Sequence, residues 1–320
     1  MRALQSTTRS VPRSASRRAA VAVSAAAPGP KRVVITGGNT GIGFEAALEL
    51  VKKGHSVTLA CRDDGKAAAA AARIKAAVPS AAVDTLHLDL ADLGSVSDAA
   101  KSLLDSPAPI DVLLNNAGVM ACPYMTTKQG FEYQFGVNHL GHFLLTTSLL
   151  PKIKASEGAR IVSVASAAHA FGKIDFDSFR SSKDYKEWPA YGQSKLANIM
   201  FTYELARRLA SDPSAPTANA LHPGVVRTEL GRYLVSDDSP FYMKIMWGMM
   251  TPFTKSPEQG AQTSIYLVSS PEVEGVSGKY FDNCRPISST PASYDTDVAR
   301  RLYDVSQELV AAAVDSAAMA

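Results

Sequence analysis

The sequence Lys31-Arg-Val-Val-Ile-Thr36-Gly37-Gly-Asn39-Thr-Gly41-Ile42-Gly43 decides which fold this chain is expected to adopt. Its apolar start, which ends at a glycine, predicts a buried strand, and residues 44–53 predict a helix. Glycines between a strand and a helix let the backbone approach a pyrophosphate, whose charge the helix N-terminus stabilises. The spacing Gly-x-x-x-Gly-x-Gly differs from the common dinucleotide fingerprint. We therefore expect a related nucleotide-binding turn, with an ordinary strand–helix turn as the alternative.

Strand and helix patterns alternate along the rest of the chain. Further strands are predicted at residues 56–61, 83–88, 110–114, 160–165, 217–221 and 278–281. Further helices are predicted at residues 67–78, 95–104, 129–155, 257–269 and 295–313, and another follows a loop at residues 171–188, carries Tyr191 and Lys195, and runs to residue 209. Repeated strand–helix units predict an α/β fold with a Rossmann-like, doubly wound parallel sheet in a three-layer αβα arrangement. Because no interdomain linker is visible, we expect a single domain over residues 31–315.

Several polar or small residues directly follow the predicted strands, where open α/β sheets bind their ligands. They are Asp89, Asn116, Gly118 and Ser166. Arg62 ends the second strand, where NAD-binding folds usually carry an acid for the ribose hydroxyls. An arginine there suits the 2′-phosphate of NADP(H) instead. Asp63 follows directly, and an exposed loop arginine is the alternative interpretation.

The stretch Tyr191-Gly-Gln-Ser-Lys195 is where we expect the chemistry. Positions four apart lie on one face of a helix, so the phenol and the ammonium can reach the same small volume. A free tyrosine titrates near ~10, and a neighbouring cation favours the phenolate and lowers that pKa. Tyr191 is therefore predicted to exchange a proton with a substrate oxygen. A solvated helix edge is the alternative.

Composition and charge exclude several classes of function. The chain has 320 residues, 46% of them hydrophobic and 20% charged, which is ordinary for a soluble globular protein. Removing the five arginines of residues 1–30 leaves 28 basic and 30 acidic residues, a net charge of −2, which gives no support for nucleic-acid binding. The three cysteines show no metal-ligand spacing, so no metal site is expected. No run is long enough to predict a membrane-spanning helix.

Residues 1–30 differ in composition from the rest of the chain. They contain Arg, Ala, Ser and Thr but no acidic residue, and the first carboxylate is Glu45. This is the composition of an organelle transit peptide, and the segment lacks the apolar core of a secretory signal. We expect a plastid address, with a mitochondrial address or a merely disordered tail as alternatives.

Two further segments are singled out by their residues. Residues 229–254 are apolar and rich in methionine, which predicts either a flap over a greasy substrate or a packing, dimer or membrane-surface contact. Asn138 lies inside a predicted helix, where asparagine is mildly unfavourable, so it either faces solvent or has a specific role. His139 and His142 have no acid or cysteine nearby and are expected to be satisfied packing residues.

Together these motifs resemble the classical short-chain dehydrogenase/reductase family over residues 31–281. The resemblance is carried, in order, by the glycine turn, Asn116-Ala117-Gly118, Ser166, Tyr191 with Lys195, and Pro223-Gly224. The motifs Asn138-His-Leu-Gly-His-Phe143, Ser166-Ala-Ala-His169 and Ser194-Lys-Leu-Ala-Asn198 are similar to the retinol-dehydrogenase-like branch. That branch includes plastid members associated with the envelope protein-import machinery and, more distantly, protochlorophyllide reductases.

The resemblance implies a role for each motif residue. Tyr191 would be the acid/base, Lys195 would lower its pKa and hold the nicotinamide ribose, Ser166 would bond the substrate oxygen, and Asn138 would fix a water. The cofactor would be bound by residues from each turn: Gly37, Asn39, Gly41, Ile42, Gly43, Arg62, Asp89, Leu90, Asn116, Ala117, Gly118, Pro223, Gly224 and Val226.

The resulting expectation is an NADPH-dependent oxidoreductase that interconverts a carbonyl and an alcohol on a lipophilic, retinal- or apocarotenoid-like molecule. Two alternatives are an NADP(H)-sensing regulatory subunit at a plastid envelope import complex and a protochlorophyllide reductase-like activity. The expected partners are the small substrate and a peripheral membrane, an envelope complex or a second copy of the chain.

Overall fold

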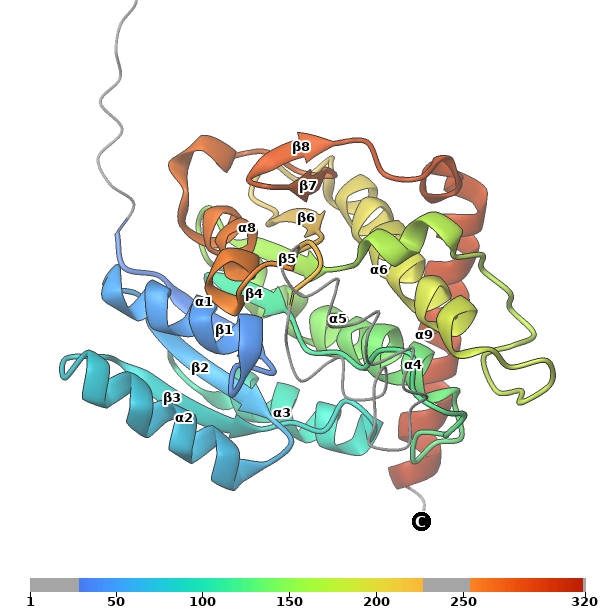
Figure 1. Cartoon of the computed structure of the whole chain (residues 1–320), viewed down its shortest axis with the longest axis horizontal. Helices are drawn as coiled ribbons and strands as arrows, with labels where there is room; N and C mark the ends of the chain where they lie inside the picture. The colour runs from blue at the N-terminus through green and yellow to red at the C-terminus, as the bar shows by residue number, and fades with distance from the viewer. Residues whose placement is uncertain (1–28, 227–253, 319–320) are drawn as a thin grey trace, which may run out of the picture.

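The protein is built on one sheet of eight strands, and the computed structural model describes residues 29–226 and 254–318, with side chains to Val314 (Figure 1). The strand order is β3-β2-β1-β4-β5-β6-β7-β8, and β1 to β7 run parallel. The strands are β1 Arg32–Thr36, β2 Ser56–Cys61, β3 Val83–His87, β4 Val112–Asn115, β5 Arg160–Val164, β6 Thr217–Leu221, β7 Tyr280–Asp282 and β8 Arg285–Ile287. The predicted Rossmann-like fold is confirmed.

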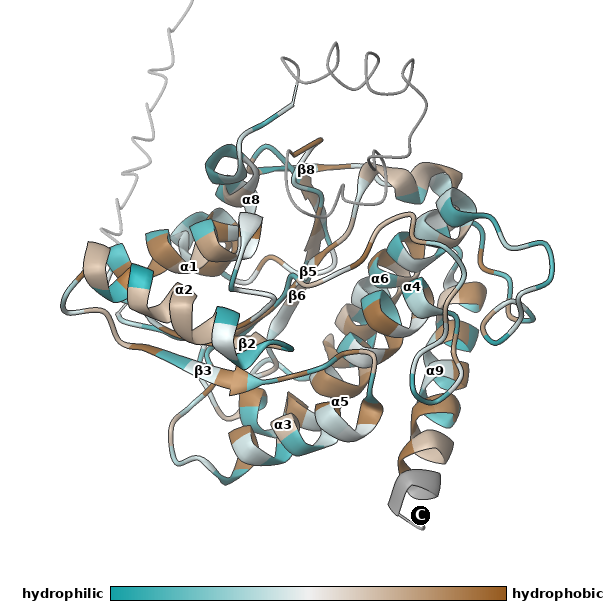
Figure 2. Ribbon diagram, turned by 60° about the horizontal axis from the view of Figure 1, so that its bottom comes forward, coloured by the Kyte–Doolittle hydropathy of each residue, from teal (hydrophilic) through white to brown (hydrophobic). Residues whose placement is uncertain are grey.

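Helices cover both faces of the sheet, as a parallel sheet requires (Figure 1). One face carries α1 (Gly41–Lys52), α2 (Asp64–Ala77) and α8 (Pro257–Ser269). The other carries α3 (Leu93–Asp105), α5 (Gly141–Lys154) and α6 (Glu187–Leu209), against which α9 (Thr296–Ala318) packs. Hydrophobic and hydrophilic residues alternate along α6 and α9 (Figure 2). The buried hydrophobic residues form one large apolar core on each face of the sheet, and the strands lie between these two cores.

The prediction of one helix over residues 129–155 is wrong in two respects. The helical segment begins later, at Tyr133, and a π-helical turn interrupts it. Gly130 has a left-handed φ of +76°, which breaks a helix there. The Glu132 carboxylate then accepts hydrogen bonds from the backbone of Gln134 and Phe135 and begins α4 (Tyr133–Phe135). A π-helical turn, Gly136–Leu140, joins α4 to α5. Such turns are rare and frequent at functional sites.

An eighth strand was not predicted. Strand β8 runs antiparallel to β7, and the turn between them places Asn283 and Cys284 at φ values of +48° and +60°. Two consecutive left-handed residues match the two-residue hairpin turn that fits strand twist. Its usual marker is a glycine, which this turn lacks, so the sequence carried little signal for it.

Two segments singled out by sequence lie mostly outside the described residues: 1–30, except the last two, and 229–254, except Thr254. Among the helices that the structure describes, none is long and apolar enough to cross a membrane.

Candidate active site

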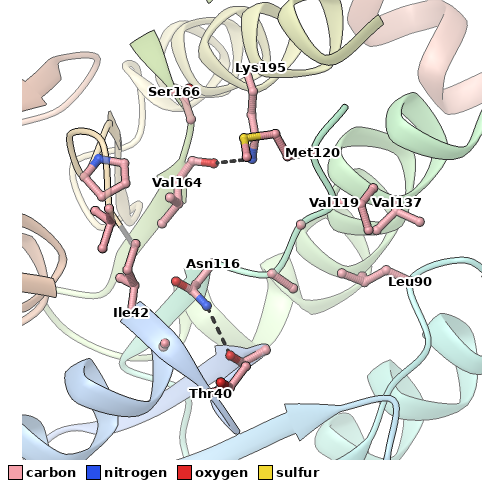
Figure 3. A pocket seen from close by; sticks show the side chains of 18 of the residues that line it. Thr40, Ile42, Leu90, Asn116, Val119, Met120, Val137, Val164, Ser166 and Lys195 are labelled. Carbon is pink, nitrogen blue, oxygen red and sulfur yellow. Dashed lines mark hydrogen bonds between the residues drawn. The ribbon is translucent and has the colours of Figure 1, made fainter. Parts of the chain in front are cut away.

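A cavity of about 820 Å³ opens at the carboxyl ends of the central strands. With the exception of Asn138, every residue predicted to contact cofactor or substrate lines it. Figure 3 shows Lys195 and Ser166 on one side of the cavity, Thr40 and Ile42 on the opposite side, and Asn116 between them. The topology thus brings together residues from six separate turns of the chain.

The glycine turn shapes one end of this cavity. Gly37 and Gly41 have φ values of +66° and +55°, which favour glycine. A Cβ on Gly43 would lie 2.4 Å from the Gly37 carbonyl oxygen, so α1 approaches the turn too closely for a side chain. Thr40 precedes α1 without a side-chain cap, which leaves the first N–H groups of the helix to the cavity. These residues fit a pyrophosphate.

The turn after β4 is tied to the end of β1. The backbone N–H groups of Asn116 and Ala117 both donate to the Thr36 hydroxyl, each at 2.9 Å. The Asn116 side-chain amide donates to the Thr36 carbonyl at 2.9 Å. Asn116 is therefore held at the floor of the cavity, between the glycine turn and Gly118.

Arg62 directly follows β2, and the carboxylate of its neighbour Asp63 interacts with Lys66 at the start of α2. The Asp63 carboxylate caps α2 by accepting from the Lys66 backbone at 2.9 Å, and the Lys66 ammonium lies 3.8 Å from its other oxygen. Arg62 Nη1 donates to the Tyr133 hydroxyl at 3.3 Å. Two cations, Arg62 and Lys66, consequently line this end of the cavity, which suits an additional phosphate.

Tyr191, Ser166 and Lys195 lie together at one corner of the cavity. The Ser166 hydroxyl accepts from the Ala168 backbone at 3.2 Å and hydrogen-bonds to the Tyr191 phenol. Lys195 Nζ lies 5.7 Å from the centre of the Tyr191 ring and donates to the Val164 carbonyl at 3.2 Å (Figure 3). A phenol, a hydroxyl and an ammonium thus share one small volume, as the spacing predicted.

The predicted effect of Lys195 on the pKa of Tyr191 is wrong. Burial raises the pKa of Tyr191 to about 12, and the hydrogen bond from Ser166 opposes this only in part. Burial also lowers the pKa of Lys195 to about 8. Both groups are almost completely removed from water, and this loss of hydration is the largest cause of each shift. Tyr191 is therefore a neutral phenol near neutral pH.

Asn138 lies behind the cavity, on the π-helical turn. Its side-chain oxygen accepts from the Val119 backbone at 2.8 Å, and its amide donates to the Val119 carbonyl and the Ser194 hydroxyl, both at 2.9 Å. Ser194 in turn donates to the Tyr191 carbonyl at 2.8 Å. Asn138 therefore connects the turn after β4 to the helix that carries Tyr191.

The two neighbouring histidines are buried and neutral. His142 Nε2 lies 2.8 Å from the Thr36 hydroxyl and Nδ1 lies 3.0 Å from the Asn138 carbonyl. Burial lowers the pKa of His142 to about 4. No group of side chains that could hold a metal ion occurs within residues 29–226 and 254–314.

Comparison with known proteins identifies the family. The model of the family "short chain dehydrogenase" matches residues 31–239. The chain belongs to this family. It is 48% identical to human retinol dehydrogenase 13 over 281 residues, which cover 88% of this chain and 84% of the relative. It is 46% identical to human retinol dehydrogenase 14 over 294 residues, covering 88% and 86%.

Solved structures support the same assignment. An uncharacterized protein from Mycobacterium Paratuberculosis has a TM-score of 0.70 and 35% identity, covering 88% of this chain and 93% of that one. An NADP-bound structure of an NAD(P) dependent gluconate 5-dehydrogenase candidate from Beutenbergia cavernae has a TM-score of 0.62 and 26% identity, covering 78% and 94%. The chain is thus an oxidoreductase of the short-chain dehydrogenase family.

Sequence reasoning missed several residues that line the cavity of this short-chain dehydrogenase. They include Thr40, Lys66, Val119, Met120, Tyr133, Val137, Phe171 and Trp188. Phe171, Trp188 and Val225 are 56%, 45% and 57% exposed, although they are large and apolar. Lys66 lies in the first turn of α2, four residues after Arg62, and its position close to Arg62 in the sequence was the available signal. The apolar residues lie in segments whose position only the folded chain defines.

Proposed function

We propose that this short-chain dehydrogenase is an NADPH-dependent oxidoreductase that interconverts a carbonyl and an alcohol on a lipophilic small molecule. The observation that carries the proposal is the corner formed by Tyr191, Ser166 and Lys195, open to a cavity whose other end is the glycine turn. Acid–base groups next to a nucleotide-binding turn suit hydride transfer coupled to proton transfer.

In the reducing direction, each side chain at this corner has a separate role. When bound, NADPH supplies the hydride that reaches the carbonyl carbon. Ser166 and Tyr191 bond and orient the carbonyl oxygen, and the neutral Tyr191 phenol gives it a proton. The Lys195 ammonium, 5.7 Å from the ring, stabilises the phenolate as it forms. The raised pKa of Tyr191 keeps the phenol protonated near neutral pH, which favours reduction.

NADP(H) is the proposed form of the cofactor. Arg62 and Lys66 both line the end of the cavity beyond β2. Asp63 is held by the start of α2 and by Lys66, and Asp64, the other acid between the two cations, lies 3.0 Å from His87 Nδ1. A 2′-phosphate would therefore meet two cations at this position rather than a free carboxylate.

The proposed substrate is an apolar carbonyl or alcohol of the retinal or apocarotenoid type. Phe171, Trp188 and Val225 are exposed at the cavity, where an apolar molecule would cover them. Proteins similar to this chain are named retinol dehydrogenases. Association with a membrane surface or a plastid envelope complex is a further proposal, supported by the composition of residues 1–30 and 229–254 alone.

The test is NADPH oxidation with all-trans-retinal and an apocarotenal. Tyr191→Phe keeps the ring and removes the proton, so kcat should fall by about 10²- to 10⁴-fold with little change in NADPH affinity. Tyr266→Phe is the matched control, because the Tyr266 hydroxyl bonds Glu272 on the surface of α8. Equal turnover by wild type and Tyr191→Phe would rule out the mechanism. NADPH binding without turnover on any carbonyl would favour the sensor alternative.

A further inference from the structure

Two histidines outside the cavity each hold the backbone of a turn that lines it. His169 lies on the turn after β5, three residues beyond Ser166, and is buried. Its Nε2 is 3.1 Å from the backbone nitrogen of Thr290, and its Nδ1 is 2.7 Å from the Ser166 carbonyl oxygen. A backbone N–H can only donate, so Nε2 is the acceptor and Nδ1 carries the proton. His169 is therefore neutral and donates to the Ser166 carbonyl.

His222 has the opposite arrangement at the end of β6. Its Nδ1 accepts from the Gly224 backbone N–H at 3.2 Å, so its proton is on Nε2. Nε2 lies 3.5 Å from Asp282 Oδ1, a buried oxygen that has no hydrogen-bond partner among the described residues. Gly224 has a φ of +85° and lines the cavity. His222 therefore secures a left-handed turn against β7.

The two histidines are joined through one aromatic ring. Tyr280 of β7 is fully buried and contacts His169 edge-on, with centroids 4.9 Å apart, and stacks on His222 at 5.7 Å. A column of His169, Tyr280 and His222 consequently spans the space behind the cavity. At one end His169 donates to the backbone carbonyl of Ser166, and at the other end His222 accepts from the backbone N–H of Gly224.

We infer that His169 and His222 are positioning residues of this enzyme: His169 sets the Ser166 hydroxyl against the substrate oxygen, and His222 sets the Pro223-Gly224 turn against the cofactor. Neither side chain lines the cavity, so each acts through the backbone that it holds. The inference rests on the proposed function for what Ser166 and Gly224 contact. It predicts that loss of the His169 contact lowers kcat, whereas loss of the His222 contact weakens NADPH binding.

Asparagine and glutamine separate the contacts made by the two ring nitrogens of each histidine. An asparagine amide reaches the place of Nδ1, and a glutamine amide reaches the place of Nε2. His169→Asn keeps a donor for Ser166, whereas His169→Gln keeps only the Thr290 contact. His222→Asn keeps an acceptor for Gly224 in an Asx-type turn, whereas His222→Gln keeps only the Asp282 contact. All four variants are polar and of similar size.

The experiment measures kcat with a retinal substrate, the NADPH dissociation constant and the melting temperature of each variant. His169→Gln should lower kcat about tenfold at unchanged NADPH affinity, because a small misplacement of a substrate contact is costly. His222→Gln should weaken NADPH binding about tenfold. The asparagine variants should stay within about threefold of wild type in both measurements.

His55 supplies the control pair. It is also buried and its Nδ1 accepts a backbone N–H, from Lys31, but at the opposite end of the sheet. His55→Asn and His55→Gln should change the melting temperature alone. The inference is overturned if asparagine and glutamine behave alike at 169 or at 222, or if kcat and NADPH affinity fall together in both glutamine variants. Turnover that survives in Tyr191→Phe would instead refute the proposed function.

Discussion

At the scale of single residues, burial decides the charge states of the reactive corner. Tyr191 and Lys195 are one helical turn apart, and in water the ammonium would make the phenol more acidic. Inside the protein both charged forms lose hydration, so the pKa values of Tyr191 and Lys195 shift to about 12 and about 8. The phenol stays neutral, and burying the Lys195 ammonium lowers the stability of the folded protein.

Replacing Lys195 tests this effect on stability. The folded protein binds the Lys195 proton less tightly than the unfolded chain does, because its pKa falls from 10.5 to about 8. Stability should therefore rise as pH increases from about 8 to about 10.5. Lys195→Met should be about 3 kcal/mol more stable than wild type near neutral pH, while losing activity, and this gap should close at high pH.

Urea unfolding of cofactor-free protein across this pH range measures the effect. Lys75→Met is the matched control, because Lys75 is exposed on α2 and its loss should leave the pH dependence unchanged. A Lys195→Met variant that keeps the wild-type slope would contradict the prediction.

Arg62 tests the choice of cofactor at the same scale. Arg62→Ala should weaken NADPH binding by about tenfold or more, since a charge-assisted bond to phosphate is lost, and should leave NADH binding nearly unchanged. Tyr133→Phe, which removes only the 3.3 Å bond to Arg62, should have a smaller effect in the same direction. Fluorescence titration with both nucleotides measures it, and an equal loss for NADH would show that Arg62 does not meet the 2′-phosphate.

At the scale of elements, the ends of strands and helices build the site. The first turn of α1 approaches Gly37 so closely that only glycine fits at position 43. The π-helical turn Gly136–Leu140 sets Asn138 between Val119 and Ser194. The close approach of α1 and the π-helical turn each bring two backbone segments together, and the cavity lies next to these contacts.

Gly43→Ala tests the close approach of α1 to the glycine turn. The new Cβ would lie 2.4 Å from the Gly37 oxygen, so the turn must move; we expect a loss of about 1–3 kcal/mol in stability together with weaker NADPH binding. Gly65→Ala is the control, because its Cβ meets nothing nearer than 3.4 Å and a helical alanine should be neutral or stabilising. Thermal unfolding and NADPH titration give both values, and wild-type binding in Gly43→Ala would contradict the geometry.

At the scale of the whole molecule, two apolar cores hold the sheet between layers of helices. The core of α1, α2 and α8 supports the glycine turn, and the core of α3, α5, α6 and α9 supports the helix that carries Tyr191. The cavity lies at the edge where both layers meet the carboxyl ends of the strands, so its shape depends on both cores.

Residues 1–30 are predicted to act apart from this body. Protein that starts at Lys31 should keep the melting temperature and activity of the full chain, since the family match also begins there. Residues 1–30 fused to a fluorescent protein should direct it to plastids, and replacing their five arginines with alanine should abolish import. Mitochondrial fluorescence, or no import, would refute the plastid address.

The sequence by itself determined the fold class and about half of the residues that line the cavity, because strand and helix periodicity and the turn residues between them are local properties. Tertiary structure alone decided the charge states of Tyr191 and Lys195, the π-helical turn that holds Asn138, the antiparallel strand β8 and the contacts of His169 and His222. Each of these depends on burial or on partners distant in sequence, such as Thr290 and Asp282, which no local pattern encodes.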